Sequence, residues 1–169
     1  DFLNPSLQAI TVAVCSFALD IAQIPAFIDG NFITITAGTF QVASGCSGLS
    51  YLLMSVTLAM VYSHLYYDKI HKKLLLLTLS IGVGLICNWT RVFTIIVIGD
   101  YTEMESPIIS DHENLGLYMY AFYMIPLLLV ARKMETPLTK SHIQQQQTPP
   151  KTLWLAFPAL ALLFSLIGP

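Results

Sequence analysis

Long runs of apolar residues limit what this chain can fold into more than any other feature of its sequence. Of its 169 residues, 55% are hydrophobic and only 11% are charged, and the mean hydropathy is +0.67. These values exclude an ordinary soluble domain. A helix needs roughly 20 apolar residues to cross the hydrocarbon core of a bilayer. The sequence offers five candidate spans, at 6–28, 47–66, 74–98, 113–131 and 152–168. We therefore expect an all-α membrane protein, a polytopic bundle of transmembrane helices.

The eight Lys and Arg residues are unevenly distributed, and their distribution predicts an orientation in the membrane. All but one lie in two polar segments, 67–73 and 132–152. Because basic loops tend to stay in the cytoplasm, both segments are predicted to lie inside. The segments 29–45 and 99–112 contain no Lys or Arg and are predicted to lie outside. The remaining basic residue, Arg91, lies within an apolar span.

This orientation brings three chemically different side chains to the outer surface. Arg91 follows Leu74 by 17 residues. That separation is roughly 25 Å of helix, in a hydrocarbon core of about 30 Å. Cys46 and His112 directly precede the second and fourth spans, at their outer ends. A thiol, a guanidinium and an imidazole on one surface indicate a cysteine enzyme.

The residues around Cys46 favour a reactive thiol. They form a turn of small residues that leads into a helix: Ser44, Gly45, Cys46, Ser47 and Gly48. The partial positive charge at a helix N-terminus favours the thiolate, which is the nucleophile. The two glycines would let a substrate backbone approach closely. The alternative is that the cysteine is a small buried hydrophobe, which is our interpretation of Cys15 and Cys87.

His112 is predicted to lie in the first turn of a helix, because Ser110 and Glu113 have the spacing of a capping box. The helix dipole there disfavours the imidazolium and keeps a neutral base available. Gly116, one turn further on, clears space for a neighbouring helix or a ligand. The alternative is that His112 only caps a loop.

Arg91 and Asn88 are three residues apart and therefore project from the same helix face. Arg91 could pair with the thiolate or donate to a developing oxyanion, and Asn88 could hold either the arginine or the substrate. Alternatively, Arg91 reaches out to lipid headgroups. Asp20 and Gln23 are costly inside a span. The sequence leaves open whether they are interfacial or line the same cavity.

Residues 31–43 alternate β-branched and aromatic residues around Ala37 and Gly38. This pattern predicts a short extracytoplasmic β-hairpin that leads into the Cys46 turn. Its edge could bind an extended peptide by strand addition. A lid packed on the helices fits the pattern equally well.

Three strings of residues resemble the motifs of the exosortase/archaeosortase family: the Cys-Ser-Gly turn within 42–52, Asn88-Trp89-Thr90-Arg91, and His112-Glu113-Asn114-Leu115-Gly116. The resemblance covers roughly 30–133. It implies a membrane cysteine protease or transpeptidase in which Cys46 is the nucleophile and Arg91 and His112 are its catalytic partners. We expect five further residues to bind substrate or support the site: Asn88, Gly45, Ser47, Gly48 and Gly116.

The resemblance also implies substrates and a location. The expected substrates are exported proteins whose C-terminus carries a short motif (Pro-Glu-Pro in many cases), a transmembrane helix and a basic cluster. The expected location is the bacterial inner (plasma) membrane, multi-pass, with the active site on the periplasmic side. Residues 1–133 would be the exosortase-like transmembrane domain, which lacks the upstream spans usual in the family. Residues 134–151 would be a cytoplasmic linker and 152–169 an additional C-terminal transmembrane segment.

Two other classes of function stay open on this sequence, whereas cofactor, metal and nucleic-acid binding are not expected. A transporter or channel segment would use Arg91, Asn88 and Asp20 to line a polar pathway, and a non-catalytic scaffold would leave Cys46 unreactive. No cofactor is expected, and no metal site, because the His and Cys residues lack ligand spacing. Nucleic acid is not an expected partner, because the net charge is only −2 and the basic residues face inward.

Overall fold

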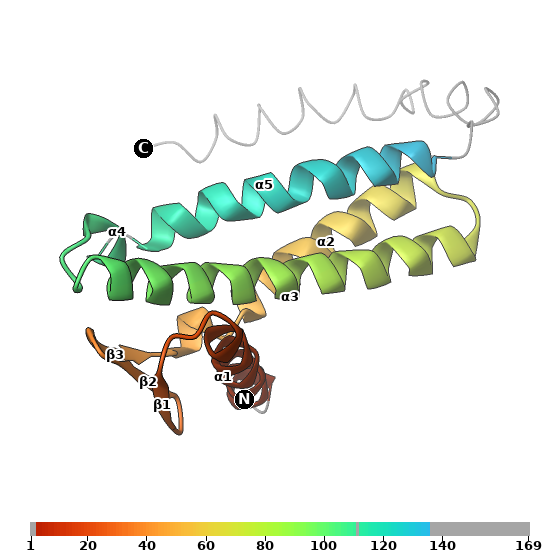
Figure 1. The fold of residues 1–169 in the computed structure, drawn as a ribbon. Coiled ribbons are helices and arrows are strands. Elements are labelled where there is room, and N and C mark those ends of the chain that lie inside the picture. Colours follow the sequence, from red (N-terminus) through yellow and green to blue (C-terminus); the bar gives the residue numbers. More distant parts are fainter. Residues whose placement is uncertain (1–2, 111, 136–169) are drawn as a thin grey trace, which may run out of the picture. The chain divides into compact units, whose positions relative to one another are not determined.

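The computed structural model describes residues 3–110 and 112–135, apart from the side chains of residues 110, 112 and 113. Most of the predicted linker 134–151 and all of the predicted segment 152–169 lie outside the described residues. The elements follow in the order α1 (Leu3–Ile21), β1 (Ala26–Asp29), β2 (Phe32–Ile35), β3 (Gly38–Gln41), the 3₁₀ turn η1 (Ser44–Cys46), α2 (Leu49–Tyr66), α3 (Ile70–Tyr101), α4 (Pro107–Ser110) and α5 (His112–Lys133) (Figure 1).

Three of the described helices are long and apolar enough to cross a membrane: α2, α3 and the part of α5 from Asn114 to Lys133. They confirm the predicted spans at 47–66, 74–98 and 113–131, although α3 is longer than predicted. Both α2 and α5 pack along α3 (Figure 1). By length and composition, these three described helices account for part of the helical membrane bundle expected from the sequence.

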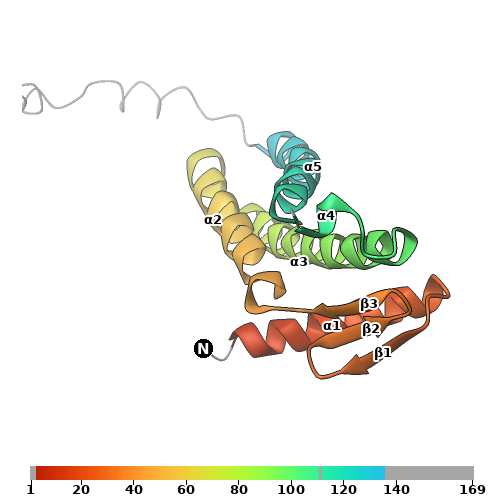
Figure 2. The same ribbon diagram turned by 90° about the vertical axis from the view of Figure 1, so that its left-hand side faces the viewer.

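The predicted span at 6–28 is wrong. The helix α1 ends at Ile21, where the Ile24 N–H donates to the Leu19 carbonyl at 3.0 Å, and residues 26–29 form β1. α1 is not among the described helices that qualify as spans. It crosses α3 instead of running along it (Figures 1 and 2). The sequence misleads because β1 is also apolar, and the polar residues Asp20 and Gln23 before it interrupt the hydrophobic run only briefly.

The predicted hairpin at 31–43 is part of a three-stranded antiparallel sheet with the order β1-β2-β3. The strands β2 and β3 form the predicted hairpin, which turns at Thr36 and Ala37, but the additional strand β1 was not predicted from the sequence. The sequence feature that could have predicted β1 is the pair Gly30-Asn31, which lies between two apolar segments and is typical of a tight hairpin turn. Gly30 adopts φ +56°, a backbone conformation that glycine takes without steric cost.

One face of the sheet packs against α1 and α3. Alternate residues of β2, Ile33 and Ile35, are buried, as the period of a strand requires. The apolar core that they enter draws on α1, the sheet and α3: Val12, Cys15, Leu19, Ile33, Ile35, Val42, Val92 and Ile96. The sheet is therefore packed on the helices as a lid would be, while strand addition at its edge stays a prediction.

Small residues bring α2 and α3 together. α2 buries Ser55, Ala59 and Ser63, which are spaced by one helical turn. A Cβ atom added to Gly84 of α3 would lie 2.9 Å from the Ser55 hydroxyl oxygen. Such close approach of small residues is typical of helix packing in membranes.

The basic segments of the described chain gather at one end of the three long helices. The Tyr67 hydroxyl donates to the Ala131 carbonyl at 2.7 Å, and the Lys72 ammonium donates to the Met134 carbonyl at 2.7 Å. Burial raises the pKa of Tyr67, so its hydroxyl stays protonated as a donor. Residues 67–73 and the end of α5 therefore share one end, while the sheet, η1 and α4 lie toward the other (Figure 1).

Candidate active site

The turn that carries Cys46 is held by short-range hydrogen bonds. The Cys46 N–H donates to the Ala43 carbonyl at 2.9 Å. The Ser47 hydroxyl donates to the Ser44 carbonyl at 2.8 Å and accepts the Leu49 N–H at 3.3 Å. Cys46 ends η1 three residues before α2 begins, so the prediction of a thiol next to a helix start is confirmed. Its side chain is partly buried.

Asn88 fixes this turn from α3. Its side chain is fully buried, and its amide Nδ2 donates to the Cys46 carbonyl at 3.0 Å and to the Thr11 hydroxyl at 3.4 Å. Thr11 in turn donates to the Ser47 carbonyl at 3.3 Å. Gly48 adopts φ +93°, and a Cβ atom there would lie 2.8 Å from the Asn88 amide nitrogen. Asn88 therefore contacts the backbone of the turn at two of its residues, and Gly48 makes room for that contact.

Arg91 lies one turn further along α3 and meets the thiol. Its Nη2 lies 3.9 Å from the Cys46 sulfur, and its Cζ lies 5.4 Å from the centre of the Tyr51 ring. Only 4% of the residue is exposed, which does not fit a side chain that reaches out to headgroups. A guanidinium stays charged and is costly to bury without a partner. Its described neighbours, a thiol and the face of an aromatic ring, both suit a cation.

Gly116 lets α5 approach the Arg91 side chain closely. A Cβ atom added to Gly116 would overlap the Tyr51 hydroxyl and lie 3.0 Å from Arg91 Nε. The predicted space beside Gly116 is therefore filled by Arg91 and Tyr51. Sequence reasoning missed both Tyr51 and Thr11. A tyrosine in the first turn of an apolar helix is a weak signal, because its hydroxyl needs a polar neighbour.

His112 is the first residue of α5, as predicted, and its side chain lies outside the description. One residue on each side of it in the sequence reaches the site. Ile109, three residues earlier, lines a pocket together with Cys46, and Gly116, four residues later, lies against Arg91. Residues four apart share one face of a helix. Position 112 therefore lies on the face of α5 that is turned toward Arg91.

The packing at Gly116 predicts the effect of a single methyl group. We expect Gly116→Ala to lower activity about tenfold or more, because its Cβ atom displaces Arg91 and Tyr51. Gly82→Ala is the matched control, since Gly82 is also helical and a Cβ atom there has no neighbour within 4 Å. Both variants are compared with the unmodified chain at equal membrane abundance. Equal activity of the two variants would show that the approach of α5 to Arg91 is not needed.

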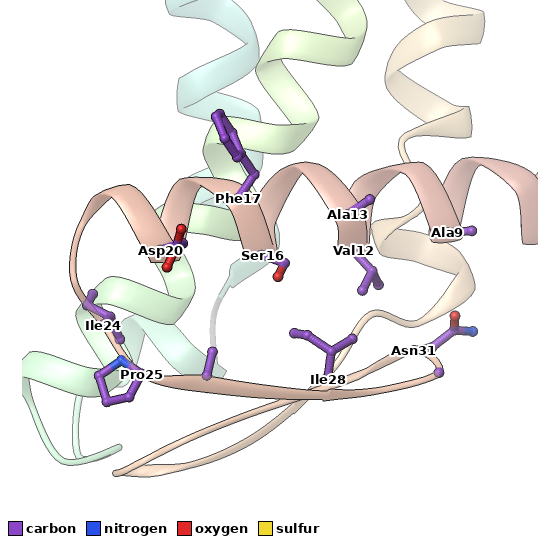
Figure 3. Close-up of a pocket in the computed structure, with 12 residues that line it drawn as sticks. Ala9, Val12, Ala13, Ser16, Phe17, Asp20, Ile24, Pro25, Ile28 and Asn31 are labelled. Atoms are coloured by element: carbon purple, nitrogen blue, oxygen red, sulfur yellow. The ribbon is translucent and has the colours of Figure 1, made fainter.

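A larger cavity of about 980 Å³ lies between α1 and β1 (Figure 3). Asp20 lines it, together with Phe17 and Ile28, while Cys46 is not among its lining residues. Asp20 therefore lines a cavity other than that of the thiol. Gln23 lies in the turn after α1, where its side-chain amide donates to the Asp20 carbonyl at 3.0 Å. The two polar residues left open by the sequence thus belong to the end of α1.

Gly45 and Gly48 differ in their surroundings. A Cβ atom on Gly45 would have no neighbour within 4 Å, so this side of the turn is open, whereas Gly48 is closed off by Asn88. Only at Gly45 does the described structure leave room for the approach of a substrate backbone that the sequence predicts. Ser47 is buried, and its hydroxyl stabilises the turn by donating to the Ser44 carbonyl.

A comparison with known protein families gives a match for this chain. Residues 1–129 match the family model for transmembrane exosortases, a stretch that contains the whole site, including position 112. No curated protein and no solved structure matched the chain in the other comparisons. Because the match covers more than half of the chain, the protein belongs to the transmembrane exosortase family.

Proposed function

We propose that this chain is a membrane-embedded cysteine protease or transpeptidase that cleaves C-terminal sorting signals of exported proteins at the extracytoplasmic face of the membrane. The observation that carries this proposal is the buried guanidinium of Arg91, 3.9 Å from the Cys46 sulfur. A buried cation at this distance is placed to stabilise the negative charge that develops when the sulfur attacks a carbonyl. Membership in a family of transmembrane enzymes supports the same reading.

In the first chemical step, His112 takes the proton of the Cys46 thiol. The thiolate then attacks the scissile carbonyl carbon, which forms a C–S bond and places a negative charge on the carbonyl oxygen. Arg91 stabilises this oxyanion from its buried position. The C–N bond breaks, and the leaving amine takes the proton from the imidazolium of His112. The product is a thioester on Cys46.

The thioester is resolved by an amine-bearing acceptor in transpeptidation or by water in hydrolysis. His112 removes a proton from the acceptor, which attacks the thioester carbonyl. The C–S bond breaks, and the sulfur recovers a proton. Asn88 contributes by holding the Cys46 backbone, so that the sulfur stays in reach of Arg91 throughout.

The arrangement of charges supports the proposed substrate class. Cys46 precedes the first residue of α2, and the basic segment 67–73 follows its last residue and lies beside the end of α5. A substrate helix followed by a basic cluster obeys the same positive-inside rule. Its basic cluster would therefore lie beside residues 67–73, and the motif before its helix would lie at the level of Cys46. We infer from this match that the substrate helix crosses the bilayer in the same direction as α2 of this chain. Its sorting motif would then lie at the same depth as the Cys46 thiol.

The transporter alternative predicts charged groups along the depth of the membrane. Among the buried residues that the structure describes, Arg91 is the one with a formal charge, and it contacts the thiol. Buried serines deeper in the bundle, such as Ser63 and Ser80, donate to carbonyls of their own helices. This distribution favours a local reaction site over a pathway.

The proposal is tested with the chain reconstituted in liposomes together with tagged exported proteins. One substrate carries the complete C-terminal tail, a second has its basic cluster replaced by Gln, and a third has an unrelated transmembrane helix. We expect cleavage of the first substrate, much less of the second and none of the third. Mass spectrometry of the product locates the broken bond and shows whether an acceptor has been added. Equal cleavage of all three, or of none, would contradict the proposed function.

A further inference from the structure

A second feature of the thiol's surroundings is a pocket that the proposed chemistry does not use. It has a volume of about 120 Å³, and Cys46 forms part of its wall. The rest of the wall comes from the 40–42 segment at the end of β3, from Val92, Ile95 and Ile96 of α3, and from Ile109 of α4. The residues of β3 and the Cys46 turn lie far in sequence from those of α3 and α4, so the pocket exists only in the folded chain.

The chemistry of this wall selects an uncharged occupant. All of the lining residues are uncharged, and most are aliphatic. A charged side chain would lose its hydration there without gaining a partner. An apolar cavity of about 150 Å³ is known to hold a ring of six carbons. The smaller volume here therefore suits a branched aliphatic side chain of three or four carbons.

We propose that this pocket is a specificity subsite, which receives one aliphatic side chain of the peptide substrate next to the bond that Cys46 attacks, with Ile109 setting its size limit. This inference rests on the proposed function, because it concerns the same thiol. Cys46 lines the pocket, so a peptide whose carbonyl lies at the Cys46 sulfur has a neighbouring side chain within reach of the pocket. The subsite is thus continuous with the site of reaction.

The edge of β3 supports an extended peptide in this position. The Val42 N–H donates to the Asn31 carbonyl at 2.8 Å, on the β2 side of the strand. Successive residues of a strand face opposite sides, so the N–H of Gln41 is directed away from β2. An extended peptide can pair with a donor of this kind by strand addition. Such pairing would align the peptide along the pocket wall that ends at Cys46.

Ile109 is the part of the wall that can vary without harm to the fold. Val42 and Ile96 are 2% and 1% exposed and belong to the core. Ile109 is only partly buried and stands on a four-residue helix. Its replacement should change the volume of the pocket while the core stays packed.

The test uses peptidyl chloromethyl ketones, Ac-Gly-Gly-X-CH₂Cl, with X as Gly, Ala, Val, Leu, Phe, Asp or Lys. The Cys46 thiolate displaces chloride, so that a C–S bond forms and the C–Cl bond breaks. Peptide mapping by mass spectrometry follows the adduct on Cys46 over time. Each rate is divided by that of the Gly reagent in the same variant, so that a general change in thiol reactivity cancels.

In the unmodified chain we expect the Val and Leu reagents to react at least tenfold faster than the Asp and Lys reagents, since each buried methylene contributes about fourfold. Ile109→Ala should raise the relative rate of the Phe reagent about tenfold. Ile109→Phe should fill the pocket and remove the advantage of Val and Leu. Ile108→Ala is the matched control, because Ile108 is the neighbouring residue of α4, is 39% exposed and does not line the pocket.

The outcomes separate this inference from the proposed function. If neither Ile109 variant changes the order of relative rates, or if Asp or Lys reagents react fastest, the subsite is overturned. Size-selective alkylation without processing of any sorting tail would contradict the proposed function and leave the subsite supported. Processing of sorting tails with alkylation that ignores the side chain X would contradict the subsite alone.

Discussion

Replacement of Cys46 by Ala is expected to abolish processing of a sorting tail, with a loss of roughly 10⁴-fold or more, because the covalent route needs its nucleophile. The fold should persist. Cys46 is only partly buried and packs at the margin of the core, so its sulfur contributes little to packing. Processing is measured on immunoblots of membranes that hold equal amounts of each variant.

Cys87→Ala is the matched control for this variant. It makes the same chemical change on α3, one turn before Arg91, at a thiol that is fully buried. We expect its activity to stay within a few fold of the unmodified chain. Full processing by Cys46→Ala, or an equal loss in both variants, would remove Cys46 from the role of nucleophile.

Substitution of Arg91 has the second largest expected effect. Arg91→Gln should lower kcat by about 10²–10³-fold, which is the usual cost of losing a group that stabilises an oxyanion. Arg91→Lys should recover part of the rate, because it keeps the charge but loses the planar fork of donors. The kinetic constants of both variants are measured with a detergent-solubilised tagged substrate.

The split between kinetic constants identifies what Arg91 acts on. A fall in kcat with slower alkylation of Cys46 by the Gly reagent would indicate that the guanidinium stabilises the thiolate. A fall in kcat with unchanged alkylation would indicate the oxyanion instead. A rise in KM alone in Arg91→Gln would contradict both roles and would indicate that Arg91 only binds the substrate.

The long apolar helices could be predicted from the sequence because each is a continuous hydrophobic run that ends at polar residues. The predictions for α2, α3 and α5 rest on this signal, and the structure confirms them. The boundary between α1 and β1 could not be predicted in the same way. Asp20, Gln23 and Pro25 lie at this boundary, but apolar residues continue on both sides of them, so hydropathy alone extends the span into the strand Ala26–Asp29.

Part of the site follows from the sequence as well. The positive-inside rule was enough to bring Cys46 and Arg91 to one level, and the structure places them in contact. The sequence left open whether Asn88 holds the arginine or the substrate. In the structure it bonds to the backbone of the Cys46 turn instead.

Other parts of the site depend on packing between distant elements. Tyr51 and Arg91 meet where α2 packs on α3, and Gly116 lets α5 approach both of them. The pocket beside Cys46 needs Ile109, which is 63 positions away in sequence. Periodicity and composition describe one element at a time, so neither feature could be read from them.

Trapping of the thioester on Cys46 tests the central claim most directly. The chain is mixed with a tagged substrate in the absence of an amine acceptor, quenched in acid within the first turnover, and analysed by peptide mapping. We predict that the peptide containing Cys46 gains the mass of the substrate portion that precedes the scissile bond, and that hydroxylamine releases it. Cleaved substrate with no adduct on Cys46, or with the adduct on another residue, would contradict the account.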